Sequence, residues 1–197
     1  MLASINPLGE RGRHQNYRLT VTAYIVGSTV AGAALGALLG ALGSLVESQI
    51  VGFGVVAAVA AIGLALDARA FGLRVPGPRR QVNENWLVTY RGWVYGSGFG
   101  AQLGLAFLTI VTASATWVAF VCALFAGSTA AGAAIGALFG LARALPILSA
   151  ARVRDPTALR AVVRRLERVR PRVAVATRAV QGTAAAGLLA LAIRSAA

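Results

Sequence analysis

The stretch GSTVAGAALGALLG at residues 27–40 returns as GSTAAGAAIGALFG at residues 127–140, with eleven of fourteen positions identical. Each copy carries glycine at intervals of five, four and four, which places small residues along one face of a helix. In lipid such faces let helix backbones approach closely, because little hydrophobic drive acts between membrane helices. The repeat therefore predicts helix packing through Gly27, Gly32, Gly36, Gly40, Gly127, Gly132, Gly136 and Gly140.

The composition around the repeat is that of a membrane protein. Of 197 residues, 57% are hydrophobic and 13% are charged, and the mean hydropathy is +0.71. The apolar residues form blocks of about 18 to 30 residues, long enough to cross a hydrocarbon core of about 30 Å. The net charge of +13 lies between these blocks, which favours contact with anionic lipid headgroups over nucleic acid. All basic residues are Arg, and with the abundance of Ala, Gly and Val this indicates a GC-rich bacterial genome.

The blocks predict an all-α, polytopic integral membrane helix bundle of five spans, or six if the first or fourth span is broken. Within the second hairpin, the polar TASAT at residues 112–116 is the predicted break between spans three and four. The predicted domains are a cytoplasmic N-terminal segment (1–18), a first helical hairpin (19–66), a basic cytoplasmic loop (67–92), a second helical hairpin (93–148), a basic amphipathic cytoplasmic helix (149–172) and a C-terminal span (173–197).

The arginines orient this layout. Seventeen of the nineteen lie on one side of it, so the positive-inside rule predicts a cytoplasmic N-terminus and cytoplasmic basic loops in a bacterial inner membrane. Span one then leaves the cytoplasm and span four enters it, which makes residues 19–46 and 117–148 an inverted internal repeat. Many transporters contain such repeats around a midplane site. Intramembrane packing alone and a transport-like two-fold site both remain open explanations.

Polar side chains inside the predicted spans are candidates for a solute site. Apart from Arg143 near the end of the fourth, no acidic or basic residue lies within the first four spans, and the absence of carboxylates there disfavours a proton-coupled pump. For Gln102, an interhelical hydrogen bond is the alternative to a substrate contact. The candidate intramembrane polar site consists of Gln102, Thr109, Thr112, Ser114 and Thr116.

Two further segments bear on the membrane surface. The aromatic residues Trp86, Tyr90, Trp93 and Tyr95 suit an interfacial belt. The segment after Asp155 alternates apolar and basic residues as an amphipathic helix does, and its cationic face suits anionic headgroups. Docking on a partner subunit, or packing into a homo-oligomer, is the other explanation. The lipid or partner surface consists of Arg160, Arg164, Arg165 and Arg168.

The residues for common catalytic chemistry are missing from the sequence. Cys122 is the only cysteine and His14 the only histidine, which excludes an intramolecular disulfide, a CxxC pair and a Cys/His metal cluster. The glycine-rich GSGFG at residues 96–100 follows no predicted strand, so it is not a nucleotide-binding loop. We therefore expect no cofactor, no metal and no enzymatic activity of the chain by itself.

Residues 98–146 resemble the second-half core of the transmembrane thiol-disulfide interchange proteins of cytochrome c biogenesis, which are grouped with the lysine-exporter type of transporters. The resemblance lies in the order of sequence features: a GFG at the start, two helices rich in small residues, and a Leu-Pro pair at Leu145 and Pro146 at the end. Members of that family relay electrons through one Cys in each of two related helices. This chain has Thr112, Ser114 and Thr116 at the expected Pro-Cys position, so the resemblance implies an inverted-repeat scaffold without disulfide exchange.

Two functional hypotheses follow. In the first, the chain is a transporter-like membrane protein that moves or senses a small solute without redox cysteines. In the second, it is a non-catalytic structural or accessory subunit that packs through its glycine faces into a larger membrane complex. Neither the solute nor the partner is identified by the sequence.

Overall fold

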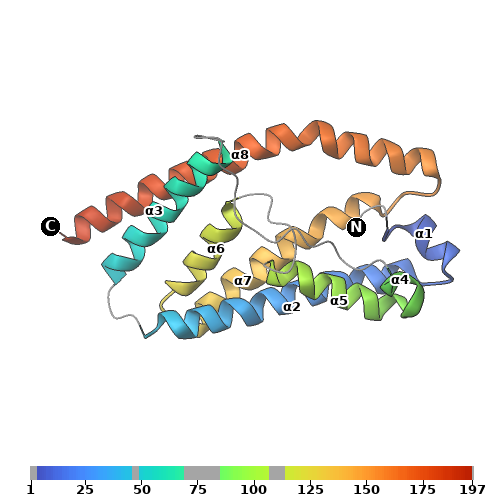
Figure 1. The fold of residues 1–197 in the computed structure, drawn as a ribbon, viewed down its shortest axis with the longest axis horizontal. Helices are drawn as coiled ribbons and strands as arrows, with labels where there is room; N and C mark the ends of the chain where they lie inside the picture. Colours follow the sequence, from blue (N-terminus) through green and yellow to red (C-terminus); the bar gives the residue numbers. More distant parts are fainter. Residues whose placement is uncertain (1–3, 46–48, 69–84, 107–113, 197) are drawn as a thin grey trace.

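A computed structural model describes residues 4–45, 49–68, 85–106 and 114–196, and within these ranges all regular structure is helical. This confirms the all-α prediction. The elements are α1 (Pro7–Gly12), α2 (Tyr17–Gly43), α3 (Gln49–Asp67), α4 (Trp86–Thr89), α5 (Gly92–Leu105), α6 (Ala115–Leu124), α7 (Thr129–Ala144), the 3-10 helix η2 (Leu145–Ala150) and α8 (Pro156–Ala196). Figure 1 shows them as an elongated bundle.

Three helical segments of the described chain are long and apolar enough to cross a membrane. They are Tyr17–Gly43, Thr129–Ala150 and Pro156–Arg194, and the shorter apolar helices Gly52–Asp67 and Ala115–Leu124 accompany them. The structure thus supports a membrane protein, while the count of five or six spans stays a prediction.

Helix α2 is the central element. It begins after Asn16, whose side chain accepts hydrogen bonds from the backbone N–H groups of Arg18 (3.1 Å) and Leu19 (3.4 Å). From there it continues unbroken for 27 residues, about 40 Å at 1.5 Å per residue. Helices α5 and α7 pack along two of its faces (Figure 1).

Glycines bring the backbones of α2 and α7 into direct contact. A Cβ atom added at Gly36 would overlap the carbonyl oxygen of Gly132, and one added at Gly32 would overlap that of Gly136. At Gly40 an added Cβ would lie 2.5 Å from the carbonyl oxygen of Ser128. Residue numbers rise along α2 as they fall along α7, so the two copies of the repeat run antiparallel.

Helix α5 packs on α2 in the parallel direction. A Cβ atom at Gly96 would lie 2.5 Å from the carbonyl oxygen of Thr20, and one at Gly104 would overlap that of Ser28. Further along α2, Gly43 faces the backbone of Leu124 at the end of α6. Helix α5 therefore lies beside the first part of α2, whereas only the end of α6 meets the end of α2, and the rest of α6 runs away from it (Figure 1).

The predicted break between spans three and four at residues 112–116 stays a prediction: α5 ends at Leu105, α6 begins at Ala115, and residues 112 and 113 lie outside the described ranges. Ser114 lies beside Gly63 near the end of α3, and Phe125 lies beside Gly52 near its beginning, so α6 runs antiparallel to α3 from residue 115 onward. The chain also reverses between α6 and α7, where Gly127 has φ +74° and Ser128 caps α7. A left-handed glycine followed by a capping serine is a strong turn signal, and a run of polar residues is a weaker one.

Helix α8 continues from Pro156 to Ala196 as one helix, across the predicted boundary at residue 172. Pro171 lies inside it and removes one backbone donor. The second half of α8 packs on α3, where Gly182 lies opposite Leu64. The amphipathic segment and the predicted C-terminal span are thus one continuous element.

Changing a glycine of the α2–α7 contact to alanine is expected to destabilise the fold. In Gly36→Ala the new methyl meets backbone that cannot rotate away, so we expect a loss of about 1–3 kcal/mol, as for overpacked cores. Thermal unfolding in mild detergent, followed by circular dichroism, measures it.

The matched control is Gly54→Ala, at a helical glycine with nothing within 4 Å of the added Cβ. Because alanine favours helix over glycine by about 1 kcal/mol, this variant should be as stable as the wild type or more so. Equal melting temperatures for both variants would contradict the close approach of α2 and α7.

Candidate functional site

A buried carboxylate lies at the end of the bundle where α1, α2 and α5 meet. Glu10 is 0% exposed, and Tyr95 donates a hydrogen bond at 2.6 Å to its carboxylate. Thr20 donates a second at 2.9 Å, and Arg13 forms an ion pair with it at 2.6 Å. The carboxylate is therefore compensated by one charge and two hydroxyl groups.

The same cluster fixes the conformation of the N-terminal segment. Asn6 caps α1 by accepting from the N–H of Gly9 at 2.9 Å, and Arg13 donates to the carbonyl of Ser4 at 2.6 Å. Burial lowers the pKa of Arg13, but hydrogen bonds to Glu10 and Tyr95 raise it more, so its net pKa is above the ordinary value. Arg13 stays charged, and α1 is held against the bundle.

The sequence did not point to this cluster. Tyr95, predicted as an interfacial anchor, is fully buried against Glu10, and Glu10 itself lies in a segment that looks polar and solvated. The available signal was Asn6 followed by Pro7, a pair typical of a helix start. That signal predicts α1, but it does not predict that Glu10 on this helix bonds to Tyr95, 85 residues away.

A second polar cluster joins α3, α6 and α8. The Ser114 hydroxyl donates to Asp67 Oδ2 at 2.7 Å, and the Ser114 N–H donates to Asp67 Oδ1 at 3.1 Å. Gln181, only 6% exposed, donates through Nε2 to the carbonyl of Ala60 and to Ser114 Oγ, both at 3.0 Å. Three helices distant in the sequence are thereby linked through one serine.

The structure describes three of the five residues of the predicted intramembrane polar site, on α5 and at the start of α6. Ser114 and Thr116 are buried at the start of α6, and the partners of Ser114 come from α3 and α8. Gln102 is half-buried on α5, which packs on α2 and α7. Thr109 and Thr112 lie outside the described residues, so their place in a polar site stays a prediction.

Six of the eight repeat glycines lie in the α2–α7 contact, and two do not. Gly27 faces α5, with an added Cβ 2.5 Å from the carbonyl oxygen of Ser97. Gly127 is exposed at the turn before α7, with nothing within 4 Å of an added Cβ. The six are Gly32, Gly36, Gly40, Gly132, Gly136 and Gly140.

The serines of the two GST copies differ in the same way. Ser28 is buried and donates to the carbonyl of Gly140 at 2.7 Å. Ser128 is exposed and caps α7 by accepting from the N–H of Ala131 at 3.1 Å. One copy thus supplies a helix-to-helix hydrogen bond, and the other supplies a turn.

The arginines predicted as a lipid or partner surface are exposed on the first half of α8. Leu159, Val162, Val163 and Leu166 on the same helix are half-buried, which matches the predicted amphipathic pattern. Their binding to lipid or to a partner stays a prediction. The exposed set consists of Arg160, Arg164, Arg165 and Arg168.

Within the described ranges, no group of three or more His, Cys, Asp or Glu side chains is placed to hold a metal ion. The two described carboxylates inside the bundle, Glu10 and Asp67, are bonded to neighbouring side chains. An apolar groove of 510 Å³ lies between α6 and α8, lined by residues such as Val118, Thr177 and Val180. The described part of the chain therefore offers polar links and an apolar groove.

Comparison with curated proteins finds relatives that share a name, methylamine utilization protein MauF. The protein of Paracoccus versutus is 35% identical over 127 residues, 63% of this chain and 45% of the relative. That of Paracoccus denitrificans is 36% identical over 116 residues, 57% of this chain and 42% of the relative. That of Methylorubrum extorquens is 30% identical over 151 residues, 74% of this chain and 53% of the relative.

The chain thus spans about half the length of the curated relatives it matches. No family model and no solved structure matches the chain. The relatives overturn the resemblance to thiol-disulfide interchange and lysine-exporter proteins, because their name is a different one. That resemblance rested on the rhythm of Gly/Ala-rich helices, which unrelated membrane proteins share because close packing in lipid demands small residues.

Removing the Tyr95 hydroxyl is expected to destabilise the N-terminal end of the bundle. Tyr95→Phe leaves the buried Glu10 carboxylate without one donor, which costs about 1–3 kcal/mol. Tyr90→Phe is the control, because Tyr90 is 48% exposed. Thermal unfolding in detergent should show a lower midpoint for Tyr95→Phe only, and equal midpoints would refute the role of the cluster.

Removing the Gln181 amide is expected to loosen α8. Gln181→Ala deletes the bonds to Ala60 and Ser114, so the second half of α8 should become more accessible to protease. Thr183→Val is the control, because that hydroxyl is exposed and bonds only within its own helix, to the carbonyl of Val180. Similar cleavage rates in both variants would sink the idea that Gln181 anchors α8.

Proposed function

We propose that this chain is a non-catalytic accessory protein of the bacterial cytoplasmic membrane that supports other proteins in methylamine utilization. The observation that carries the proposal is the sequence identity of 30–36% to proteins named for methylamine utilization. The apolar helices support the membrane location. The fold and the clusters described above support an accessory role over solute transport.

The first support is the rigidity of the centre. Helix α2 contacts both α5 and α7 through backbone atoms, so neither neighbour can slide without breaking many contacts at once. Transport by alternating access needs one group of helices to move against another around a substrate site. A centre closed by backbone contact suits a scaffold better.

The second support is the use of the carboxylates of Glu10, which is buried, and Asp67, which is half-buried. A methylammonium ion inside a membrane protein would need an acidic or aromatic partner to replace its water. Glu10 is compensated by Arg13, Tyr95 and Thr20, and Asp67 accepts two hydrogen bonds from Ser114. Both carboxylates hold helices together instead of facing an open solute site.

The basic end of the bundle supports a cytoplasmic N-terminus. Arg11 and Arg18 line the same hollow as Arg154, and Gln15 accepts a hydrogen bond at 2.9 Å from the backbone N–H of Gly92, the residue after Arg91. The start of α2, the start of α5 and the end of η2 thus lie at one end (Figure 1). By the positive-inside rule this end faces the cytoplasm.

The surface of α8 supports contact with other chains. In the most apolar stretch of α8 only 6% of the residues are buried within this chain, and Val173, Val180 and Leu189 are exposed along the helix. A membrane helix so little covered by its own chain has most of its side left for lipid or partner helices. We assign the partner contacts to this helix.

Purification of the tagged chain from membranes of a methylamine-grown host tests the proposal. We expect other membrane proteins to co-purify in fixed stoichiometry in mild detergent, and native mass measurement to give their ratio. We also expect proteoliposomes of the chain alone to take up no radiolabelled methylammonium. A homogeneous chain that accumulates methylammonium would contradict the accessory role and favour the transport hypothesis.

A further inference from the structure

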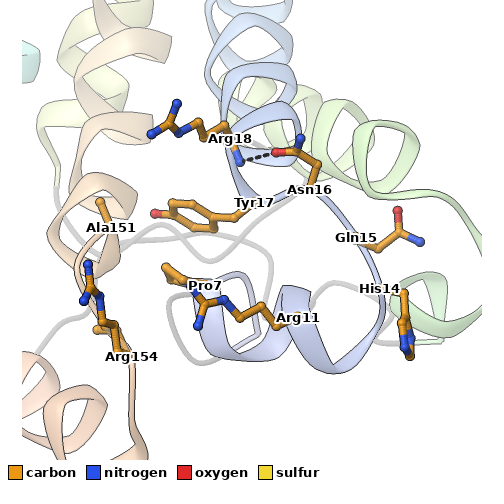
Figure 2. Close-up of a pocket in the computed structure, with 10 residues that line it drawn as sticks. Pro7, Arg11, His14, Gln15, Asn16, Tyr17, Arg18, Ala151 and Arg154 are labelled. Carbon is orange, nitrogen blue, oxygen red and sulfur yellow. Dashed lines mark hydrogen bonds between the residues drawn. The ribbon is translucent and has the colours of Figure 1, made fainter.

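A basic hollow of 740 Å³ lies at the N-terminal end of α2, between the α1–α2 junction and residues 151–154. Its volume falls within the range of about 300–1,000 Å³ that small-molecule sites occupy. Figure 2 shows the side chains of Arg11, Arg18 and Arg154 around the hydroxyl end of Tyr17. Three separate segments therefore bring cationic groups to one place.

The hollow is cationic without compensation. No acidic side chain lies among the described residues that line it. The nearest carboxylates in the sequence are used elsewhere, since Glu10 pairs with Arg13 and Asp155 accepts from the N–H of Ala158 at 2.7 Å. In the part of the chain that the structure describes, no ion pair engages Arg11, Arg18 or Arg154. Their positive charge is available to a ligand.

Tyr17 supplies a second, independent indication of a ligand. Its ring packs against the core, and its hydroxyl oxygen is buried with no hydrogen-bond partner among the described residues. An unpaired buried hydroxyl costs free energy, so such groups normally have a partner. In Figure 2 this hydroxyl points toward the space between Arg18 and Arg154.

The chemistry of the hollow suits phosphate. Guanidinium groups bind phosphate oxygens through paired N–H donors, and a tyrosine hydroxyl donates one more hydrogen bond. Three arginines exceed the single negative charge of one phosphodiester. They match better a ligand that carries two phosphodiesters close together.

The position of the hollow suits a lipid headgroup. Tyr17 and Arg18 form the first turn of one candidate span, and Ala151 directly follows another, Thr129–Ala150. Basic pockets at such ends bind the headgroups of anionic lipids. Leu19 (52% exposed) and Leu148 (47% exposed) lie next to this end in the sequence and offer apolar surface to acyl chains.

We propose that this hollow binds the headgroup of diphosphatidylglycerol (cardiolipin), the anionic lipid with two phosphodiesters. Arg11, Arg18 and Arg154 bind the phosphates, and the Tyr17 hydroxyl donates a hydrogen bond to one of them. The site is separate from the α8 arginines named above and needs no partner protein. Its test is therefore independent of the accessory function.

The experiment measures the lipid that the full chain retains in native mass spectra after exchange into phosphatidylcholine nanodiscs. One set of nanodiscs contains about 10% diphosphatidylglycerol, and the other contains about 20% phosphatidylglycerol, so that both carry equal lipid charge. We expect one bound diphosphatidylglycerol and about tenfold weaker retention of phosphatidylglycerol. The triple variant R11Q/R18Q/R154Q should lose this binding. The control R160Q/R164Q/R165Q, which removes three exposed charges from α8, should keep it.

Tyr17→Phe separates binding from folding. Because the hydroxyl has no hydrogen bond within the described chain, we expect an unchanged melting temperature in lipid-free detergent and several-fold weaker retention of diphosphatidylglycerol.

Equal retention by the R11Q/R18Q/R154Q variant and the wild type would overturn the site. Equal loss in both triple variants would overturn it in favour of general surface charge. Stabilisation by millimolar inorganic phosphate that matches stabilisation by the lipid would overturn the assignment to a headgroup.

Discussion

The contact between α2 and α7 is the constraint on which the rest of the structure depends. Gly32 and Gly36 meet Gly136 and Gly132 backbone to backbone, at a separation that leaves no room for a single methyl group. In lipid, where apolar burial contributes little to helix association, this close approach supplies the packing contacts that hold two spans together. Helix α5 uses the same device on another face of α2, so α2 forms the axis of the bundle.

The outer elements are held differently, by buried polar groups. Glu10 ties α1 to α2 and α5, and Ser114 links α3, α6 and α8 through Asp67 and Gln181. A hydrogen bond in an apolar environment is costly to leave unmade, so each cluster specifies one arrangement of its helices. Backbone packing fixes the arrangement of α2, α5 and α7 at the centre of the molecule. Buried hydrogen bonds fix the positions of α1, α3, α6 and α8 around it.

These interactions bear directly on function. A closed glycine contact and two fully engaged carboxylates leave the described part of the chain with few of the features that a transport site needs. What it leaves open lies at its surface, in the little-covered α8 and in the basic hollow beside Tyr17. An accessory protein acts through such surfaces. The relatives that share sequence with this chain are named for methylamine utilization, which is the basis of the proposed accessory role.

Composition and periodicity by themselves determined that the chain is helical, that it belongs in a membrane, and that the glycines of its repeat lie on helix faces, because these properties follow from local patterns. The tertiary structure alone decided which faces meet. Gly27 and Gly127 share the repeat but not its contact, and the chain reverses at Gly127, between α6 and α7. The pairing of Glu10 with Tyr95 joins residues far apart in the chain, and so does the hollow that Arg18 and Arg154 both line. No local pattern records such pairs, because they arise only when the helices have packed.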